Sequence, residues 1–175
     1  STGSDFAANV ELAEALMPQA VAAEFETMAL FDTPDAKTID ALSKNHGIAP
    51  DTSLKTLFVE DAQGGLVALV LRGDQQLNEI KAEKISGISQ PLRMAQESAV
   101  KIATGASFGS LGPVGLDVRI VVDRAASVLT NFVCGANEEG KHLKGVNWQR
   151  DIPKFEVADL RTVSAGDPSP CGTGH

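Results

Sequence analysis

The 175-residue sequence contains no tyrosine and one tryptophan, and aromatic residues make up 5% of it. No aromatic stripe suited to stacking nucleobases is visible, so the aromatic residues are expected in the core. Basic residues are outnumbered, with 15 lysines and arginines against 23 acidic residues and a net charge of −8. Because phosphate contacts supply most non-specific affinity for nucleic acids, a freestanding nucleic-acid binder with a broad basic surface is excluded. Any contact with RNA has to be local, or another domain has to hold the RNA.

Cysteine and histidine are also scarce. Cys134 and Cys171 are far apart and form no C-x-x-C, which indicates two reduced thiols in a cytoplasmic protein. His46, His142 and His175 are scattered without the paired spacing of a metal site, so no metal is expected. No apolar run is long enough to span a membrane, and the first residues have neither the basic region nor the apolar core of a signal peptide.

Helical and strand-like patterns alternate along the chain, with clear hairpins. "LKTLFVED" (residues 54–61) and the almost wholly apolar "LVALVLRGD" (66–74) flank a Gly-Gly turn and predict a hairpin whose second strand is buried on both faces. A second hairpin is expected within 130–148, and a further strand in 116–124. Helices are expected at 9–25, at 33–46 with Thr33 as cap and Gly47 as stop, at 75–85 and at 95–105. This order predicts an α+β fold with a mixed, largely antiparallel sheet.

One stretch is unusually rich in glycine: "FGSLGPVG", residues 108–115. It lacks the Lys-Ser/Thr of a P-loop and the spacing of a dinucleotide-binding loop, so a phosphate cradle is excluded. Two interpretations stay open. The loop is either a plain tight turn or a pocket wall in which glycine lets the backbone approach a ligand closely.

Two basic features have a structural and a functional interpretation. Lys55, at the start of a strand-like run, is either a solvated strand end or a functional lysine. The segment "GKHLKGVNWQRDIPK" (140–154) is locally basic in an acidic chain. Its lysines either protect the edge of a hairpin from further pairing or offer phosphate a small landing place.

Seven stretches together, in this order, closely resemble one family. They are "DTPDAKTIDAL", "LKTLFV", "LVLRGDQQLNEIKAEK", "GSLGPV", "VVDRAAS", "GANEEGKHLKGVNWQRD" and "ADLRTVSAGDPSP". They resemble the insertion (editing) domain of bacterial-type prolyl-tRNA synthetase, which is related to freestanding prolyl-tRNA editing proteins. The resemblance covers residues 6–175, and the ends resemble the synthetase segments that lead into and out of the insertion. It implies a single editing domain over 1–175, with 1–10 and 164–175 as connectors.

The resemblance implies an α+β fold with a mixed, barrel-like sheet flanked by helices. It also implies an aminoacyl-tRNA deacylase that hydrolyses the ester of mischarged alanyl-tRNA(Pro). The expected partners are the aminoacyl-CCA end of tRNA(Pro) and the rest of the synthetase, itself a homodimer, in the cytoplasm and without a membrane. The domain itself needs no cofactor and no metal, whereas the parent ligase uses ATP. The alternative is a non-catalytic insertion that scaffolds the synthetase or orients the acceptor end.

The family's functional residues map onto matching positions of this sequence. The resemblance implies that Lys55, in the K-T-L element, is the functional lysine of the editing site. It places the G-x-x-x-P loop on Gly109, Ser110, Leu111, Gly112 and Pro113. His142, in G-K-H, is implied to limit the size of the side chain admitted, and Asp123 and Asn137 are further pocket candidates. No side-chain nucleophile or strong base emerges, so catalysis by positioning a water is expected.

Overall fold

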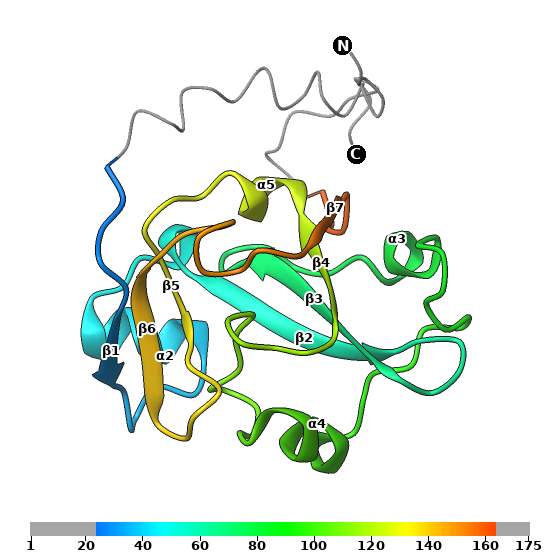
Figure 1. Ribbon diagram of the computed structural model, residues 1–175, viewed down its shortest axis with the longest axis horizontal. Coiled ribbons are helices and arrows are strands. Elements are labelled where there is room, and N and C mark those ends of the chain that lie inside the picture. The colour runs from blue at the N-terminus through cyan, green and yellow to red at the C-terminus, as the bar shows by residue number, and fades with distance from the viewer. Residues whose placement is uncertain (1–23, 164–175) are drawn as a thin grey trace.

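A computed structural model describes residues 24–163. Within that range it contains seven strands and four α-helices, arranged as two sheets with helices around them (Figure 1). Residues 9–23 of the helix expected at 9–25, and the connectors expected at 1–10 and 164–175, lie outside the described residues, and residues 24–25 are not helical. No helix within 24–163 is long and apolar enough to cross a bilayer.

The larger sheet has four strands in the order β2-β3-β4-β7, namely β2 (Leu54–Glu60), β3 (Leu66–Arg72), β4 (Arg119–Asp123) and β7 (Glu156–Ala158). β2 and β3 form the predicted antiparallel hairpin, with Thr56 opposite Val70. The β3–β4 and β4–β7 pairs are parallel, so the sheet is mixed as expected. β2 lies at its edge, which leaves one side of that strand open to other elements.

The smaller sheet has three antiparallel strands in the order β1-β6-β5, namely β1 (Ala29–Asp32), β6 (Lys141–Val146) and β5 (Phe132–Gly135). β5 and β6 are the second predicted hairpin. A parallel bridge from Ser53 to Val133 brings β5 alongside the start of β2. The α+β prediction is therefore confirmed, but the strands lie in two sheets instead of closing into one barrel.

Both faces of β3 are buried, as its apolar run predicts. Ala68 and Val70 face the smaller sheet and share a core with Phe132 and Cys134. The alternate residues of β3 face a second core, which α3 (Glu79–Glu83) covers through Ala82. Because successive strand residues point to opposite faces, one strand supplies both cores. Burial raises the pKa of the Cys134 thiol, so this cysteine is an inert core residue.

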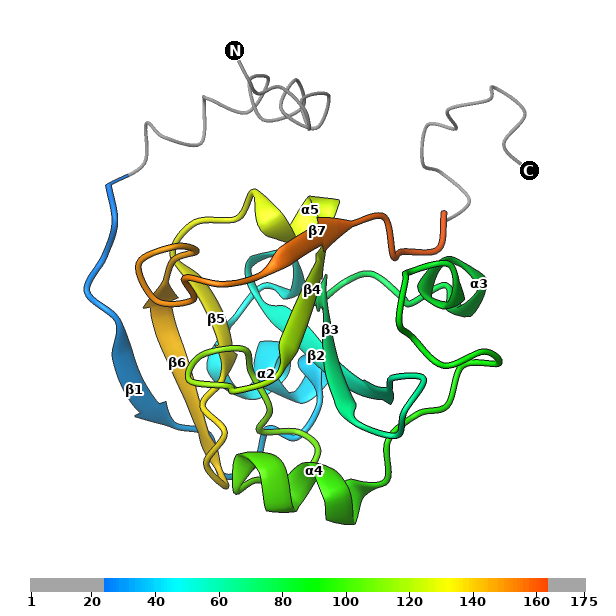
Figure 2. The same ribbon diagram turned by 45° about the vertical axis from the view of Figure 1, so that its right-hand side comes forward.

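Three further helices surround the sheets, namely α2 (Ile39–His46), α4 (Glu97–Thr104) and α5 (Arg124–Ser127). Figure 2 shows α4 below the two sheets, α3 beside the larger one and α5 at the opposite end from α4. A 3-10 turn, Pro50–Thr52, connects α2 to β2. As predicted, Gly47 ends α2 in the left-handed region, with a φ of 69°.

The predicted start of α2 was wrong. Thr38, not Thr33, caps this helix, because the Thr38 hydroxyl accepts a hydrogen bond from the Ala41 amide. Thr33 is buried, and its hydroxyl pairs with His142 across the molecule. The Thr33 carbonyl accepts from the Ala36 amide, which forms a separate turn before the helix. The Thr33 hydroxyl, which the local sequence pattern assigned to capping the helix, is therefore engaged in a long-range hydrogen bond with His142.

Candidate functional site

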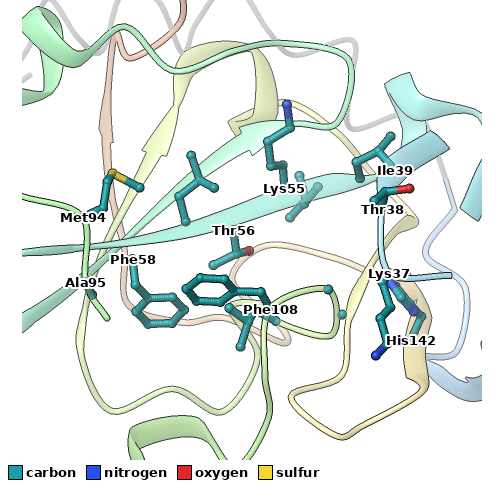
Figure 3. A pocket seen from close by; sticks show the side chains of 15 residues that line it. Lys37, Thr38, Ile39, Lys55, Thr56, Phe58, Met94, Ala95, Phe108 and His142 are labelled. Atoms are coloured by element: carbon teal, nitrogen blue, oxygen red, sulfur yellow. The ribbon is translucent and has the colours of Figure 1, made fainter. Parts of the chain in front are cut away.

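A cleft of about 330 Å³ lies between the open edge of β2 and the glycine loop. Its floor is formed by residues 54–58 of β2, and one side by residues 37–39 before and at the start of α2. The remaining walls come from elsewhere in the chain: Met94, Ala95, Phe108, Gly109, Leu111, Gly135 and His142. A volume of this size is at the low end for cavities that enclose small organic ligands. Figure 3 shows the side chains around it.

Glycine in the loop is required by contact between backbones. A Cβ on Gly112 would overlap the Gly135 carbonyl oxygen, and a Cβ on Gly135 would overlap the Leu111 carbonyl. Gly109 has a φ of 102°, and a Cβ there would meet the Lys37 carbonyl oxygen at 2.9 Å. The loop is therefore packed against both β5 and the segment before α2. This supports the pocket-wall interpretation, because a wall pinned on two sides cannot move to admit a larger ligand.

Asn137 fixes the loop from behind. Its side chain accepts a hydrogen bond from the Gly112 amide at 2.9 Å and donates to the carbonyls of Gly112 and Val114. Its own amide donates to the Ser110 carbonyl at 2.7 Å. Asn137 sits in the left-handed region with a φ of 58°, which asparagine tolerates better than most residues. Asn137 does not line the cleft, so it shapes the site through the loop.

The other loop residues have different positions. Gly109 and Leu111 line the cleft, whereas Ser110, Gly112 and Pro113 are buried or partly buried behind it. The Ser110 amide donates to the Ser107 carbonyl, and the Gly112 amide is held by Asn137. Two of the amides expected to face a ligand are therefore already occupied. Any main-chain donor from this loop has to come from Gly109 or Leu111.

His142 lies on β6 and borders the cleft while only 6% exposed. Its Nδ1 is 2.5 Å from the Thr33 hydroxyl, and the Phe31 ring lies 6.3 Å from its ring centroid. Burial, with a smaller contribution from His46, lowers the pKa of His142 to about 4. The imidazole is therefore neutral at pH 7, and its position is fixed by a buried hydrogen bond. This suits a rigid, uncharged wall.

Lys55 and Thr56 are adjacent on β2 and point to opposite faces, as Figure 3 shows. The Lys55 ammonium donates to the Gln75 carbonyl at 2.6 Å, turned away from the side of Phe108 and His142. Burial lowers the pKa of Lys55, and nearby Asp74 partly offsets this. Lys55 contributes to the cleft because β2 is an edge strand, but the structure does not bring its ammonium to His142.

Thr56 is one of the residues lining the cleft that the sequence did not single out. It is 9% exposed, and its hydroxyl is buried without a hydrogen-bond partner among the described residues. The Phe58 carbonyl accepts from the Ala95 amide, so the even-numbered residues of β2 present their backbone groups at the open edge. Thr56 thus lines the cleft with an edge-facing amide and a buried hydroxyl that has no partner. The "KT" pair was visible in the sequence, but the strand register that aims Thr56 inward was not.

Asp123 does not border this cleft. It is 1% exposed at the end of β4, where it accepts hydrogen bonds from the amides of Ala125, Leu160 and Arg161. These bonds cap α5 and hold the chain after β7. The structure therefore gives Asp123 a structural task, and a direct contact with substrate stays a sequence prediction.

Most cations of the basic segment 140–154 have partners within the chain. Lys141 pairs with Asp32 at 2.6 Å, and the Lys144 ammonium lies 5.5 Å from the centre of the Phe31 ring. Arg150 pairs with Asp151. Lys141 and Lys144 thus hold β6 against β1. In residues 24–163 no group of three or more histidine, cysteine, aspartate or glutamate side chains has the geometry to hold a metal ion.

Comparison with known proteins agrees with this arrangement. The family model for the aminoacyl-tRNA editing domain matches residues 33–152, and the chain belongs to this family. The crystal structure of hypothetical protein APE2540 is 25% identical with a TM-score of 0.66, covering 86% of this chain and 99% of that one. A protein described as a candidate trans-editing enzyme for prolyl tRNA synthetase is 19% identical with a TM-score of 0.65, covering 77% of this chain and 87% of that one. The chain is thus an aminoacyl-tRNA deacylase domain, and domains of this family bind the aminoacyl end of a mischarged tRNA.

Proposed function

We propose that this domain hydrolyses the ester of alanyl-tRNA(Pro), releasing alanine and tRNA(Pro), as the editing insertion of a prolyl-tRNA synthetase. The observation that carries the proposal is the rigid inner wall of the cleft, built from Gly109, Gly135 and the fixed imidazole of His142. A wall of main chain pinned against other main chain sets a sharp size limit. It admits a methyl side chain and rejects the larger proline ring, which is the second-sieve logic of editing.

Hydrolysis needs a positioned water and a stabilised carbonyl oxygen. Water adds its oxygen to the ester carbon, the bond from that carbon to the ribose oxygen breaks, and a water proton passes to the ribose oxygen. The vicinal ribose hydroxyl orients this water. The unpaired Thr56 hydroxyl and the edge-facing Thr56 amide donate to the carbonyl oxygen as negative charge develops there.

Lys55 lies on the opposite face of β2 and binds the ribose or the terminal phosphate through its positive charge. Because the chain carries a net charge of −8, most of the affinity for tRNA comes from the rest of the synthetase. The rest of the synthetase also carries out the ATP-dependent ligation. The solved structure described as a candidate trans-editing enzyme for prolyl tRNA synthetase supports this choice of substrate, since it has the same fold.

The test is a deacylation panel with alanyl-, cysteinyl- and prolyl-tRNA(Pro). The alanyl ester is expected to be hydrolysed and the prolyl ester spared. Lys55→Ala should reduce the rate at least tenfold, whereas Lys84→Ala, at an exposed lysine at the end of α3, should not. Absence of turnover with all three esters, alone and within the synthetase, would favour the non-catalytic insertion. Equal rates for Lys55→Ala and wild type would remove Lys55 from the site.

A further inference from the structure

Phe108 is an aromatic residue that is not buried in the core. It is 50% exposed and lines the cleft together with Gly109 and Leu111. Trp148 and Phe132, by contrast, are buried with their ring centroids 5.0 Å apart. Figure 3 shows the Phe108 ring beside Phe58 and below Thr56, at the cleft. A half-exposed ring at the rim of a ligand site offers a flat apolar face to whatever enters.

The backbone beneath this ring is held by two carboxylates. The amide and hydroxyl of Ser107 both donate to the Glu139 carboxylate, at 2.8 and 2.5 Å. The Phe108 amide donates to Glu97 at 3.0 Å. Three charge-assisted bonds to two consecutive residues fix the base of an exposed aromatic side chain. The ring is therefore presented from a preorganised support, and ordering it costs little when a ligand binds.

A second exposed apolar side chain borders the same cleft. Met94 is 47% exposed and pairs through its backbone with Val59 of β2, and the following Ala95 amide donates to the Phe58 carbonyl at 2.9 Å. Met94 is thus held next to the β2 floor of the cleft, and Phe108 directly precedes Gly109 in the loop that forms its wall. Lys37, exposed at the same cleft, adds a positive charge to the lining.

We propose that Phe108 is the stacking platform for the terminal adenine of the tRNA. In this arrangement the rim of the cleft recognises the nucleoside and its interior recognises the amino acid. This inference rests on the proposed function, because it assumes an aminoacyl-adenosine end as ligand. An alanyl group occupies only part of a cleft of about 330 Å³. The attached ribose and base then extend to the rim, and aromatic faces stack bases without needing a particular hydrogen-bond pattern.

The test measures binding without ester chemistry, so it stays informative even if hydrolysis fails. Adenosine monophosphate and ribose 5-phosphate are titrated into the 175-residue chain and followed by amide NMR. Adenosine monophosphate is expected to shift the signals of residues 107–111 and to bind more tightly than ribose 5-phosphate. Phe108→Leu should weaken nucleotide binding roughly 5- to 150-fold, and Phe108→Trp should retain it.

Ile102→Ser is the matched control, since Ile102 is 87% exposed on α4 and does not line the cleft. It should bind the nucleotide like wild type. Equal binding of the two ligands, or unchanged nucleotide binding by Phe108→Leu, would overturn the proposal. So would sedimentation data in which Phe108→Leu dissociates a dimer that Ile102→Ser retains, because the ring would then belong to an interface between copies. In deacylation, Phe108→Leu should raise KM while kcat changes little.

Discussion

Gly112 and Gly135 pass so close that neither position has room for a Cβ. The contact joins the glycine loop to the last residue of β5. It links the proposed pocket wall to the structural core, because β5 carries the buried Phe132 and Cys134. If the loop limits the size of the substrate side chain as proposed, stability and selectivity depend on the same backbone contact.

Gly112→Ala should lower the free energy of unfolding by about 3 kcal/mol or more, because the new methyl group overlaps a carbonyl oxygen that packing holds in place. Gly115→Ala is the control. Gly115 has a φ of 79°, but apart from its two chain neighbours no residue has a heavy atom within 4 Å of the position that a Cβ would take, so only backbone strain of roughly 1 kcal/mol is expected. Urea unfolding measures both. Equal losses would show that the close approach is not what requires glycine at 112.

Asn137→Ala should cost about 2–4 kcal/mol, because it removes the side-chain bonds to the loop and leaves the Gly112 amide without its acceptor. Asn45→Ala is the matched control, since Asn45 is exposed and makes one long hydrogen bond to the Asp35 carbonyl at 3.3 Å. That change should stay within about 0.5 kcal/mol. If alanine were tolerated at 137, the loop would have to be held by its glycine contacts alone.

Thr56→Val should separate function from stability. It replaces a buried hydroxyl without a partner by a methyl group, so unfolding should become about 1 kcal/mol harder or stay unchanged. Deacylation of alanyl-tRNA(Pro) should nevertheless fall by at least tenfold. Thr52→Val, at an exposed threonine bonded to the Ala49 carbonyl, should leave the rate unaltered. Full activity in Thr56→Val would assign the carbonyl oxygen to another donor.

His142 should make stability depend on pH in the mildly acidic range. Its pKa is about 4 in the folded chain and 6.5 when unfolded, so below pH 6.5 the unfolded state binds the proton first. Stability should fall as pH drops from about 6.5 to 4, by roughly 3 kcal/mol in total, and this contribution should then level off. Chemical unfolding of His142→Asn across the same range should lack this component. A parallel decline in both proteins would mean that other groups cause it.

Strands β2 to β6, both hairpins and the ends of α2 and α4 at Gly47 and Gly105 could be predicted from the sequence, because each depends on neighbouring residues, whereas the short edge strands β1 and β7 were not predicted. The cap of α2 could not be predicted, because the Thr33 hydroxyl bonds to His142, which lies 109 positions away in the sequence. At the site, the resemblance singled out Lys55 and His142, yet which face of β2 meets the cleft follows from tertiary packing. Thr56, Met94 and Phe108 are apolar or weakly polar residues in ordinary patterns, and only the fold shows that they share one cavity.

The open edge of β2 has a consequence for the solution behaviour of the protein. Unpaired strand edges recruit strands from other molecules and so promote aggregation. Here the unpaired stretch is short, because β2 meets Met94 at Val59 and the chain reaches Val133 at Ser53. The stretch between these two bridges is also recessed beneath the glycine loop. The same recess that we propose as the ester site is thus too short and too enclosed to pair with a strand of another molecule, so backbone groups of β2 stay unpaired at the cleft without promoting aggregation.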